Sequence, residues 1–162
     1  RPGVIWGPGD ATFLPRFAAL LRRGRMVLVD GGRNRLGLSH VENLAQGMIL
    51  AARAPAAAGQ TYHLTDGEEI TAAEAFRLLA AALGVPAPRR SLAFPVAYAL
   101  ASLMEAWAKL RRQAAPPAFT RYGVRLVACD SVYGISKARH ELGYRPELTF
   151  RRGVAALAEA LP

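Results

Sequence analysis

The chain has 162 residues, of which 52% are hydrophobic and 20% charged, so it can fold around a core and is not a disordered polyelectrolyte. Its single cysteine, Cys129, excludes a disulfide framework and a metal site built from several thiolates. The net charge of +9 comes mostly from scattered arginines, without an RNP-like aromatic motif, zinc-finger spacing or a basic-region helix, so we expect no nucleic-acid partner.

The first half of the chain alternates between strand and helix signals. Short apolar runs bounded by turn residues predict four strands, at 4–6, 26–29, 36–39 and 62–64. Apolar residues at helical spacing predict three helices, at 12–23, 41–53 and 72–83. We expect Thr12 to cap the first helix, and capping boxes that begin at Ser39 and Thr71 to open the other two.

The second half is mostly helical. Helices are expected at 92–110, 119–129, 136–142 and 149–161, and Pro116 and Pro117 separate the first two. The whole is an α/β layout with too few strands for a self-sufficient doubly wound sheet. Because an apolar strand also stands at the first residues, we interpret the chain as the C-terminal part of a longer protein.

The most apolar helix runs from Leu92 to Leu110. Its apolar stretch is too short to span a bilayer, and the basic residues Lys109, Arg111 and Arg112 follow it. Three interpretations stay open: a lid over an apolar substrate, a helix lying at a membrane surface, and a helix buried within a small domain.

Four stretches in a fixed order resemble extended short-chain dehydrogenases/reductases of the NAD-dependent epimerase/dehydratase superfamily. They are RPGVIWGPGD at 1–10, RLGLSHVENLA at 35–45, YHLTDG at 62–67 and SKARHELGYRP at 136–146. The chain is most similar to the 3β-hydroxysteroid dehydrogenase branch, which includes bacterial reductases of long-chain 2-alkyl-3-oxo acids. This resemblance implies the C-terminal part of an extended Rossmann fold, with the last sheet strands and a small, mostly helical substrate-binding domain.

The resemblance also implies how the single, incomplete unit 1–162 divides. Segments 1–10 and 41–84 would belong to the dinucleotide-binding domain, and segments 11–40 and 85–162 to the substrate-binding region. The family's glycine-rich phosphate turn and its catalytic serine, tyrosine and lysine are expected upstream of Arg1. This chain alone is therefore predicted to be inactive.

The activity implied for the intact protein is that of an NAD- or NADP-dependent oxidoreductase. It would interconvert a secondary alcohol and a ketone on a hydrophobic, steroid-like or long-chain 3-oxo substrate, as a homodimer. The alternatives are a nucleotide-sugar epimerase or dehydratase of the same fold, and a stand-alone binding or membrane-associated helical module. A cytoplasmic location is expected. The alternative is association with a membrane through the apolar helix 92–110.

Candidate site residues follow from the resemblance. Pro2, Gly3 and Val4 are expected to contact the cofactor, because proline removes a donor and glycine lets the backbone approach a flat ring; an ordinary buried strand is the alternative. The substrate contacts are expected from Ile5, Trp6, Phe13 and Arg35. Core packing is the alternative for the three apolar residues, and an ordinary surface position is the alternative for the arginine.

Other reactive residue types are expected to be structural. Tyr133 and Lys137 form a literal Y-x-x-x-K, but Ser136 is expected to start the helix and leave Tyr133 outside it, so we interpret the pair as non-catalytic. Cys129 lies in an apolar stretch and is expected in the core. No metal site is expected, because the three histidines lack metal-ligand spacing: His40, His63 and His140.

Overall fold

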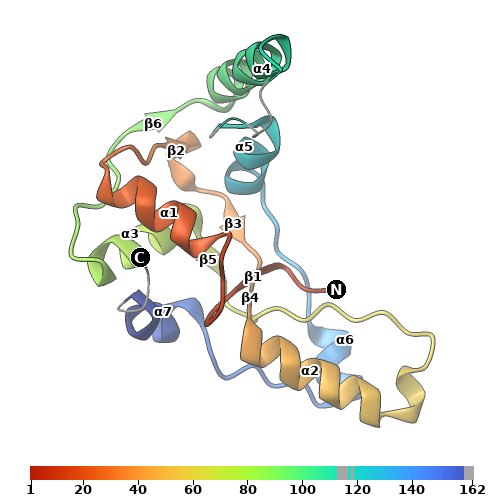
Figure 1. Cartoon of the computed structure of the whole chain (residues 1–162). Coiled ribbons are helices and arrows are strands. Elements are labelled where there is room, and N and C mark those ends of the chain that lie inside the picture. Colours follow the sequence, from red (N-terminus) through yellow and green to blue (C-terminus); the bar gives the residue numbers. More distant parts are fainter. Residues whose placement is uncertain (113–116, 118, 159–162) are drawn as a thin grey trace.

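The protein is described by a computed structural model that covers residues 1–112, 117 and 119–158 (Figure 1). The strands are β1 (Val4–Trp6), β2 (Leu28–Val29), β3 (Arg35–Leu36), β4 (Leu38–His40), β5 (Ile70–Thr71) and β6 (Ser91–Leu92). The helices are α1 (Leu14–Arg22), α2 (Val41–Arg53), α3 (Ala72–Ala82), α4 (Phe94–Leu110), α5 (Arg121–Ala128), α6 (Ser136–Leu142) and α7 (Phe150–Ala158). Two 3-10 turns, η1 (Asp30–Gly32) and η2 (Pro55–Ala57), complete the elements.

The strands form three two-stranded sheets. β1 pairs with β4 and β2 pairs with β6 in parallel, whereas β3 and β5 are antiparallel. Figure 1 shows α4 at one end of the molecule and α2 with α6 at the other, with the β1–β4 pair between them. The α/β class is confirmed, with few strands and many helices.

Three of the four predicted strands differ from those observed. The strand expected at 26–29 is reduced to β2. The strand expected at 36–39 is two strands, because the chain changes partner at Gly37: β3 pairs with β5, and β4 pairs with β1. The strand expected at 62–64 is only a parallel bridge between Pro2 and Leu64. Around that bridge the Arg1 terminal amine donates to the Tyr62 carbonyl at 2.7 Å, and Leu64 N–H donates to the Arg1 carbonyl at 3.0 Å.

The helices are found where they were predicted, but two of the three caps are different residues. Asp10, not Thr12, caps α1, and its carboxylate accepts from the N–H groups of three following residues. Burial raises the pKa of Asp10, but these donors outweigh it and lower the pKa below its ordinary value. The first turn of α1 is therefore held by a carboxylate that stays ionised.

The second helix shows why a local capping motif can fail. The imidazole of His40 caps α2 by accepting from Glu42 N–H, because the Ser39 hydroxyl is already engaged. That hydroxyl accepts from Gly3 N–H at 2.9 Å and donates to the Leu64 carbonyl at 2.7 Å, which joins β4 to two other segments. The third cap is confirmed, since the Thr71 hydroxyl accepts from the N–H of Glu74 in α3.

Two further sequence predictions, on Cys129 and Leu92, are wrong, and two others fall on residues that the structure does not describe. The exposed thiol of Cys129 follows the end of α5, where the helix no longer covers it, so it is not a core residue. The helix expected to begin at Leu92 begins at Phe94, because Leu92 pairs with β2. Pro116 and the predicted helix end at Leu161 lie outside the described residues.

The main core lies among β1, α1, α3 and α7, around the fully buried Trp6 and Phe150, whose rings are 4.9 Å apart. A second core lies between α2 and α6, around Leu64, Leu142 and Tyr144. Such burial supplies most of the free energy of folding, at roughly 25 cal/mol per Å² of apolar surface. A third cluster joins β2 to α4 and α5 through small side chains.

The interpretation of α4 as a buried helix is wrong. Its fully buried residues are Ala97, Ala101 and Ala108, and Phe94 and Tyr98 are partly buried against the third cluster. The other large apolar side chains of the helix are exposed. Within the described part of the chain, no helix combines the length and the hydropathy needed to cross a bilayer.

Tyr144 gives the second core a measurable response to alkaline pH. Its hydroxyl donates to the Thr65 carbonyl at 3.1 Å, and burial, followed by the nearby charge of Asp66, raises its pKa to about 12. A raised pKa means that the stability which Tyr144 contributes is present below its ordinary pKa of about 10 and is lost as the pH rises toward the folded-state value.

We expect Tyr144→Phe to lower the free energy of unfolding by about 1 kcal/mol at neutral pH, because the Thr65 carbonyl loses its donor. Between about pH 10 and pH 12 the wild type should lose a further 2–3 kcal/mol, roughly, that the variant does not lose. Urea unfolding at several alkaline pH values measures both quantities, and parallel pH profiles for the two proteins would contradict the assignment.

Candidate functional site

The predicted cofactor contacts stand at the start of β1, where three backbone segments are stacked closely. A Cβ on Gly3 would overlap the carbonyl of Gly37, and a Cβ on Gly37 would overlap the carbonyl of Ser131. Gly37 N–H also donates to the Ser131 hydroxyl at 3.0 Å. The close approach of the Gly37 backbone, just before β4, is therefore sufficient to require a glycine at position 3.

Pro2 has a different environment from Gly3. It is exposed and bridges to Leu64, whereas Gly3 and Val4 are partly buried. The cofactor contact stays a prediction, and the surface that could make it is that of Pro2.

The predicted substrate residues are divided between the surface and the core. Trp6 is fully buried and Phe13 nearly so, and both belong to the main core. Ile5, between Val4 and Trp6 on β1, exposes 44% of its surface. The alternation of the strand turns Ile5 away from the core that buries its neighbour, so it is the apolar member of the set that a ligand can reach.

Arg35 lies on β3 and is already held by acidic partners. Its guanidinium donates twice to a carboxylate oxygen of Asp130, at 3.1 and 3.3 Å, and lies 3.6 Å from Glu69. Hydrogen bonding to Asp130 and the charges of both acids raise the pKa of Arg35 above its ordinary value. A guanidinium engaged in this way has little capacity left for a phosphate group.

Beneath β1 lies a buried polar network that the sequence did not identify. The Asp66 carboxylate accepts from Trp6 Nε1–H at 2.7 Å, from His40 N–H at 2.7 Å and from Asn43 Nδ2–H at 2.8 Å. The amide of Asn43 also donates to the Leu148 carbonyl and accepts from the Glu147 and Leu148 N–H groups. One carboxylate thus joins β1, β4 and α2, and through Asn43 the segment that leads into α7.

The electrostatics of this network are those of a buried acid. Burial raises the pKa of Asp66 above its ordinary value, and the three hydrogen-bond donors only partly offset this. The sequence contains one signal for this network, Asp66, an acidic residue two positions after the apolar run 62–64. A turn explains an acidic residue at this position equally well.

Tyr133 and Lys137 have separate partners. Tyr133 lies outside α6, as predicted, and its ring stacks on His63 with centroids 4.9 Å apart. Lys137 is on α6, donates to Gln60 Oε1 at 2.7 Å and lies over the ring of Tyr62. The N-cap position of α6 is Ile135 rather than Ser136. The non-catalytic interpretation stays a prediction, and this geometry agrees with it.

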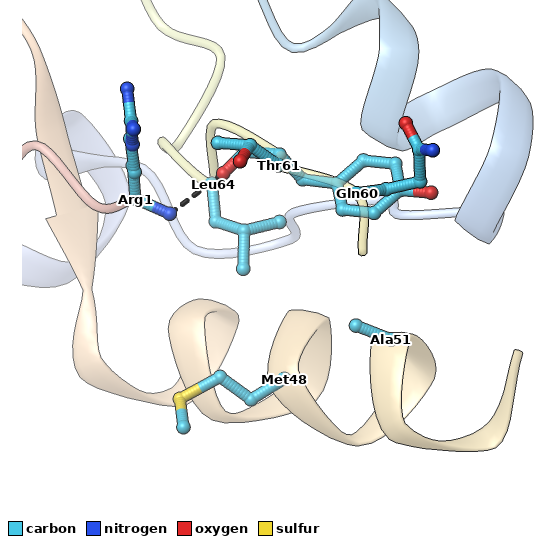
Figure 2. Close-up of a pocket in the computed structure, with 7 residues that line it drawn as sticks. Arg1, Met48, Ala51, Gln60, Thr61 and Leu64 are labelled. Atoms are coloured by element: carbon cyan, nitrogen blue, oxygen red, sulfur yellow. Dashed lines mark hydrogen bonds between the residues drawn. The ribbon is translucent and has the colours of Figure 1, made fainter. Parts of the chain in front are cut away.

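A pocket of about 310 Å³ lies between α2 and the segment 60–64 (Figure 2). Met48 and Ala51 line it on the helix side, and Arg1, Thr61 and Leu64 lie opposite, with the Arg1 amine bonded to the Tyr62 carbonyl. None of the predicted substrate residues lines it. Across the described residues, there is no cluster of three histidine, cysteine or acidic side chains that could hold a metal ion.

The sequence matches the model of the 3-beta hydroxysteroid dehydrogenase/isomerase family over residues 1–96. It is 35% identical to a 2-alkyl-3-oxoalkanoate reductase of Stenotrophomonas maltophilia over 97% of this chain and 49% of that protein. It is 39% identical to a 4-hydroxy-2-methyl-3-oxo-4-farnesyl-3,4-dihydroquinoline-1-oxide ketoreductase of Stigmatella aurantiaca, over 100% of this chain and 48% of that protein. The chain thus spans about half the length of the curated relatives that it matches.

Solved structures agree on the fold. The crystal structure of gox2253 is 25% identical, with a TM-score of 0.67 over 99% of this chain and 48% of that one. A human epimerase family protein solved with NADPH, SDR39U1, is 20% identical, with a TM-score of 0.69 over 99% of this chain and 48% of that one. A UDP-glucuronic acid 4-epimerase of Bacillus cereus, solved with NAD, is 15% identical, with a TM-score of 0.65 over 98% of this chain and 43% of that one. The predicted fold of the extended short-chain dehydrogenases/reductases is confirmed.

Proposed function

Because the chain belongs to the 3-beta hydroxysteroid dehydrogenase/isomerase family, we propose that it is the substrate-side half of an NAD(P)-dependent oxidoreductase. The enzyme interconverts a secondary alcohol and a ketone on a hydrophobic substrate, steroid-like or with a long 3-oxo chain. The observation that carries this proposal is the family match over 1–96, which takes in β1, the buried network below it and the exposed Ile5. The names of the relatives, a 3-oxoalkanoate reductase and a ketoreductase, support the reaction.

The nicotinamide cofactor supplies or accepts the hydride in such a reaction. In this chain the exposed Pro2 fits a contact with a flat ring, because it offers apolar surface and no donor. The Cβ side of Gly3 packs against the Gly37 carbonyl, so its close packing does not require a cofactor, and its contact with the ring stays a prediction. We assign the acid and base groups to the part of the relatives that this chain does not span, and the proposed dimer and the division into two domains stay predictions.

Within the site, Ile5 provides the substrate surface. It lies on β1, three residues after the exposed Pro2, which precedes the strand, and its exposed side chain offers apolar surface to a substrate carbon chain. Trp6 and Phe13 are left out of the proposed substrate site, since the core buries both. They hold β1 in place.

The nucleotide-sugar alternative depends on a free basic group for the phosphates. Arg35 is the residue that the sequence offers, and its two acidic partners disfavour that role. The test is turnover by the whole protein of two substrates. Reduction of a long-chain 2-alkyl-3-oxo acid is followed as loss of NADPH absorbance, and conversion of UDP-glucuronic acid, which consumes no NADPH when it is an epimerisation, is followed by chromatography of the sugar nucleotides. Turnover of the sugar nucleotide alone would overturn the proposal.

We expect Ile5→Ala in the whole protein to raise KM for a long-chain 3-oxo substrate about three- to tenfold with little change in kcat, because a pocket loses apolar contact. Ile49→Ala is the matched control, since Ile49 is the same residue type, is similarly exposed, at 51%, and lies on α2 rather than on β1. Steady-state kinetics with a long and a short 3-oxo acid measure the effect. Equal KM changes for both chain lengths, or for both variants, would remove Ile5 from the substrate site.

A further inference from the structure

The segments that lead into β2 and β6 carry a group of exposed arginines. Because the two strands pair in parallel, with Leu28 beside Ser91, the segments before them meet at the same end of the pair. Leu28 N–H donates to the Arg90 carbonyl at 2.9 Å, which joins the two segments directly. Figure 1 shows the end of α1 and the start of β6 on the same side of the molecule. We call the exposed arginines of these segments the arginine group: Arg23, Arg25, Arg89 and Arg90.

The arginine group stands apart from the acidic residues of the chain. Across the described residues, none of its four guanidinium groups forms an ion pair, whereas Arg35, Arg121 and Arg151 each do. The two stretches that carry the group, 11–29 and 75–104, contain no aspartate or glutamate. The group is therefore a local excess of positive charge rather than half of an internal ion-pair network.

The acidic residues that border these two stretches are engaged with other groups. Asp10 and Asp30 accept from backbone N–H groups at the starts of α1 and α4. Glu74 and Glu105 each bind an arginine outside the group, at 2.8 and 2.7 Å. The bordering carboxylates thus leave the charge of the arginine group available to a partner.

Both segments of the group have a backbone that is already ordered. Arg25 N–H donates back to the Leu20 carbonyl at 2.9 Å, which fixes the turn after α1. On the other segment Pro86 and Pro88 restrict the backbone, and the Arg90 carbonyl is bonded to β2. A partner that binds here does not have to order the backbone, so the entropy cost of docking is low.

Four guanidinium groups in this arrangement complement several negative charges in a row. Each guanidinium presents a planar fork that can bind one carboxylate or phosphate through two parallel hydrogen bonds. In the free protein the four positive charges repel one another, and an anionic partner removes this repulsion.

The surroundings of the group favour an acidic protein segment over a nucleic acid or a bilayer. The exposed aromatic side chains of the described residues lie on α4, on α5 and before α6, so they offer no ring beside the group on which a base could stack: Trp107, Tyr122 and Tyr133. A bilayer contact needs large apolar side chains next to the charges, and the described segments 11–29 and 75–93 expose none.

We propose that the arginine group docks an acidic segment of a partner protein, in which aspartate or glutamate side chains follow one another along the chain. The segment lies across the end of the β2–β6 pair, and its carboxylates bind the arginines that follow α1 together with those that precede β6. The proposal does not depend on the proposed reaction.

The test uses the whole protein and a fluorescently labelled oligo-glutamate peptide of about ten residues, which is long enough to reach both segments. We expect fluorescence anisotropy to show saturable binding. This binding should weaken at least about tenfold between roughly 50 mM and 500 mM salt, because exposed charges are screened. An oligo-lysine peptide of the same length should not bind.

Two pairs of substitutions separate docking at the arginine group from general attraction to a basic protein. Arg25→Gln with Arg90→Gln removes one charge from each segment and is expected to weaken peptide binding about five- to thirtyfold. Arg53→Gln with Arg145→Gln is the matched control, because it removes two exposed charges from the end of α2 and from the segment after α6, at the other end of the molecule. The control variant should bind within about twofold of the wild type. All four positions are exposed, so the thermal melts of both variants are expected to match that of the wild type.

Four results would overturn the proposal. They are a lack of saturable binding up to about 1 mM peptide, equal weakening by the two pairs of substitutions, binding that does not respond to salt, and tighter binding of an oligodeoxythymidylate of the same charge. The last would assign the arginine group to a nucleic acid.

Discussion

Replacing Gly3 with alanine is expected to lower the free energy of unfolding by roughly 3–5 kcal/mol, or to prevent folding. The new Cβ would overlap the Gly37 carbonyl, and Gly37 is itself closely packed, because a Cβ on it would overlap the Ser131 carbonyl. Both obstacles are backbone atoms of paired segments rather than ends of flexible side chains. The segments that carry Gly3 and Gly37 must therefore move apart to admit one methyl group.

The measurement is denaturant unfolding followed by the fluorescence of Trp6, which leaves a fully buried site when the chain unfolds. Gly134→Ala is the matched control, because a Cβ there meets open space and the backbone has no positive φ. That variant should unfold within about 0.5 kcal/mol of the wild type. If Gly3→Ala were equally harmless to stability but weakened NADPH binding by the whole protein, the glycine would serve the cofactor after all.

The sequence predicted helices well because helices depend on local order. Apolar periodicity and stop signals such as Gly24 and Gly84 act within a few residues, and all the predicted helices are observed. Strands of two or three residues depend on partners far along the chain. Leu92 illustrates this: the local sequence suggests that it continues an apolar helix, but it pairs with Val29, 63 residues earlier in the chain.

The helix caps and the site residues were harder to predict, because they too depend on partners that are distant in the sequence. Ser39 has the spacing of a capping box, but bonds to Gly3 and Leu64, distant in sequence, take its hydroxyl. Trp6 and Ile5 are neighbours of similar apolar character, and only the fold shows that one is core and the other surface. In α4 both faces are apolar, so composition alone could not show that Ala97, Ala101 and Ala108 turn inward.

Substitution of Asp66 is the second change that we expect to lower stability strongly. Asp66→Ala leaves three buried donors without an acceptor, those of Trp6, His40 and Asn43, and we expect it to lower the free energy of unfolding by roughly 3–5 kcal/mol. Asp66→Asn should cost less, because its oxygen can still serve His40 and Asn43, while its amide faces the Trp6 N–H as a second donor. Urea unfolding of the three proteins gives the order, and an alanine variant as stable as the asparagine variant would contradict it.

Measuring the stability of the wild type and of Asp66→Asn over a range of pH isolates the contribution of the Asp66 carboxyl group. Because burial raises the pKa of Asp66, the folded state holds this proton more tightly than the unfolded chain does. The stability that Asp66 contributes is therefore fully present below the ordinary pKa of an aspartic acid and is lost as the pH rises through the raised, folded-state value. The asparagine variant has no such proton, and every other carboxyl group is common to both proteins. The advantage of the wild type should shrink from acid toward neutral pH, and an advantage that grows instead would mean that the donors of Trp6, His40 and Asn43 outweigh burial.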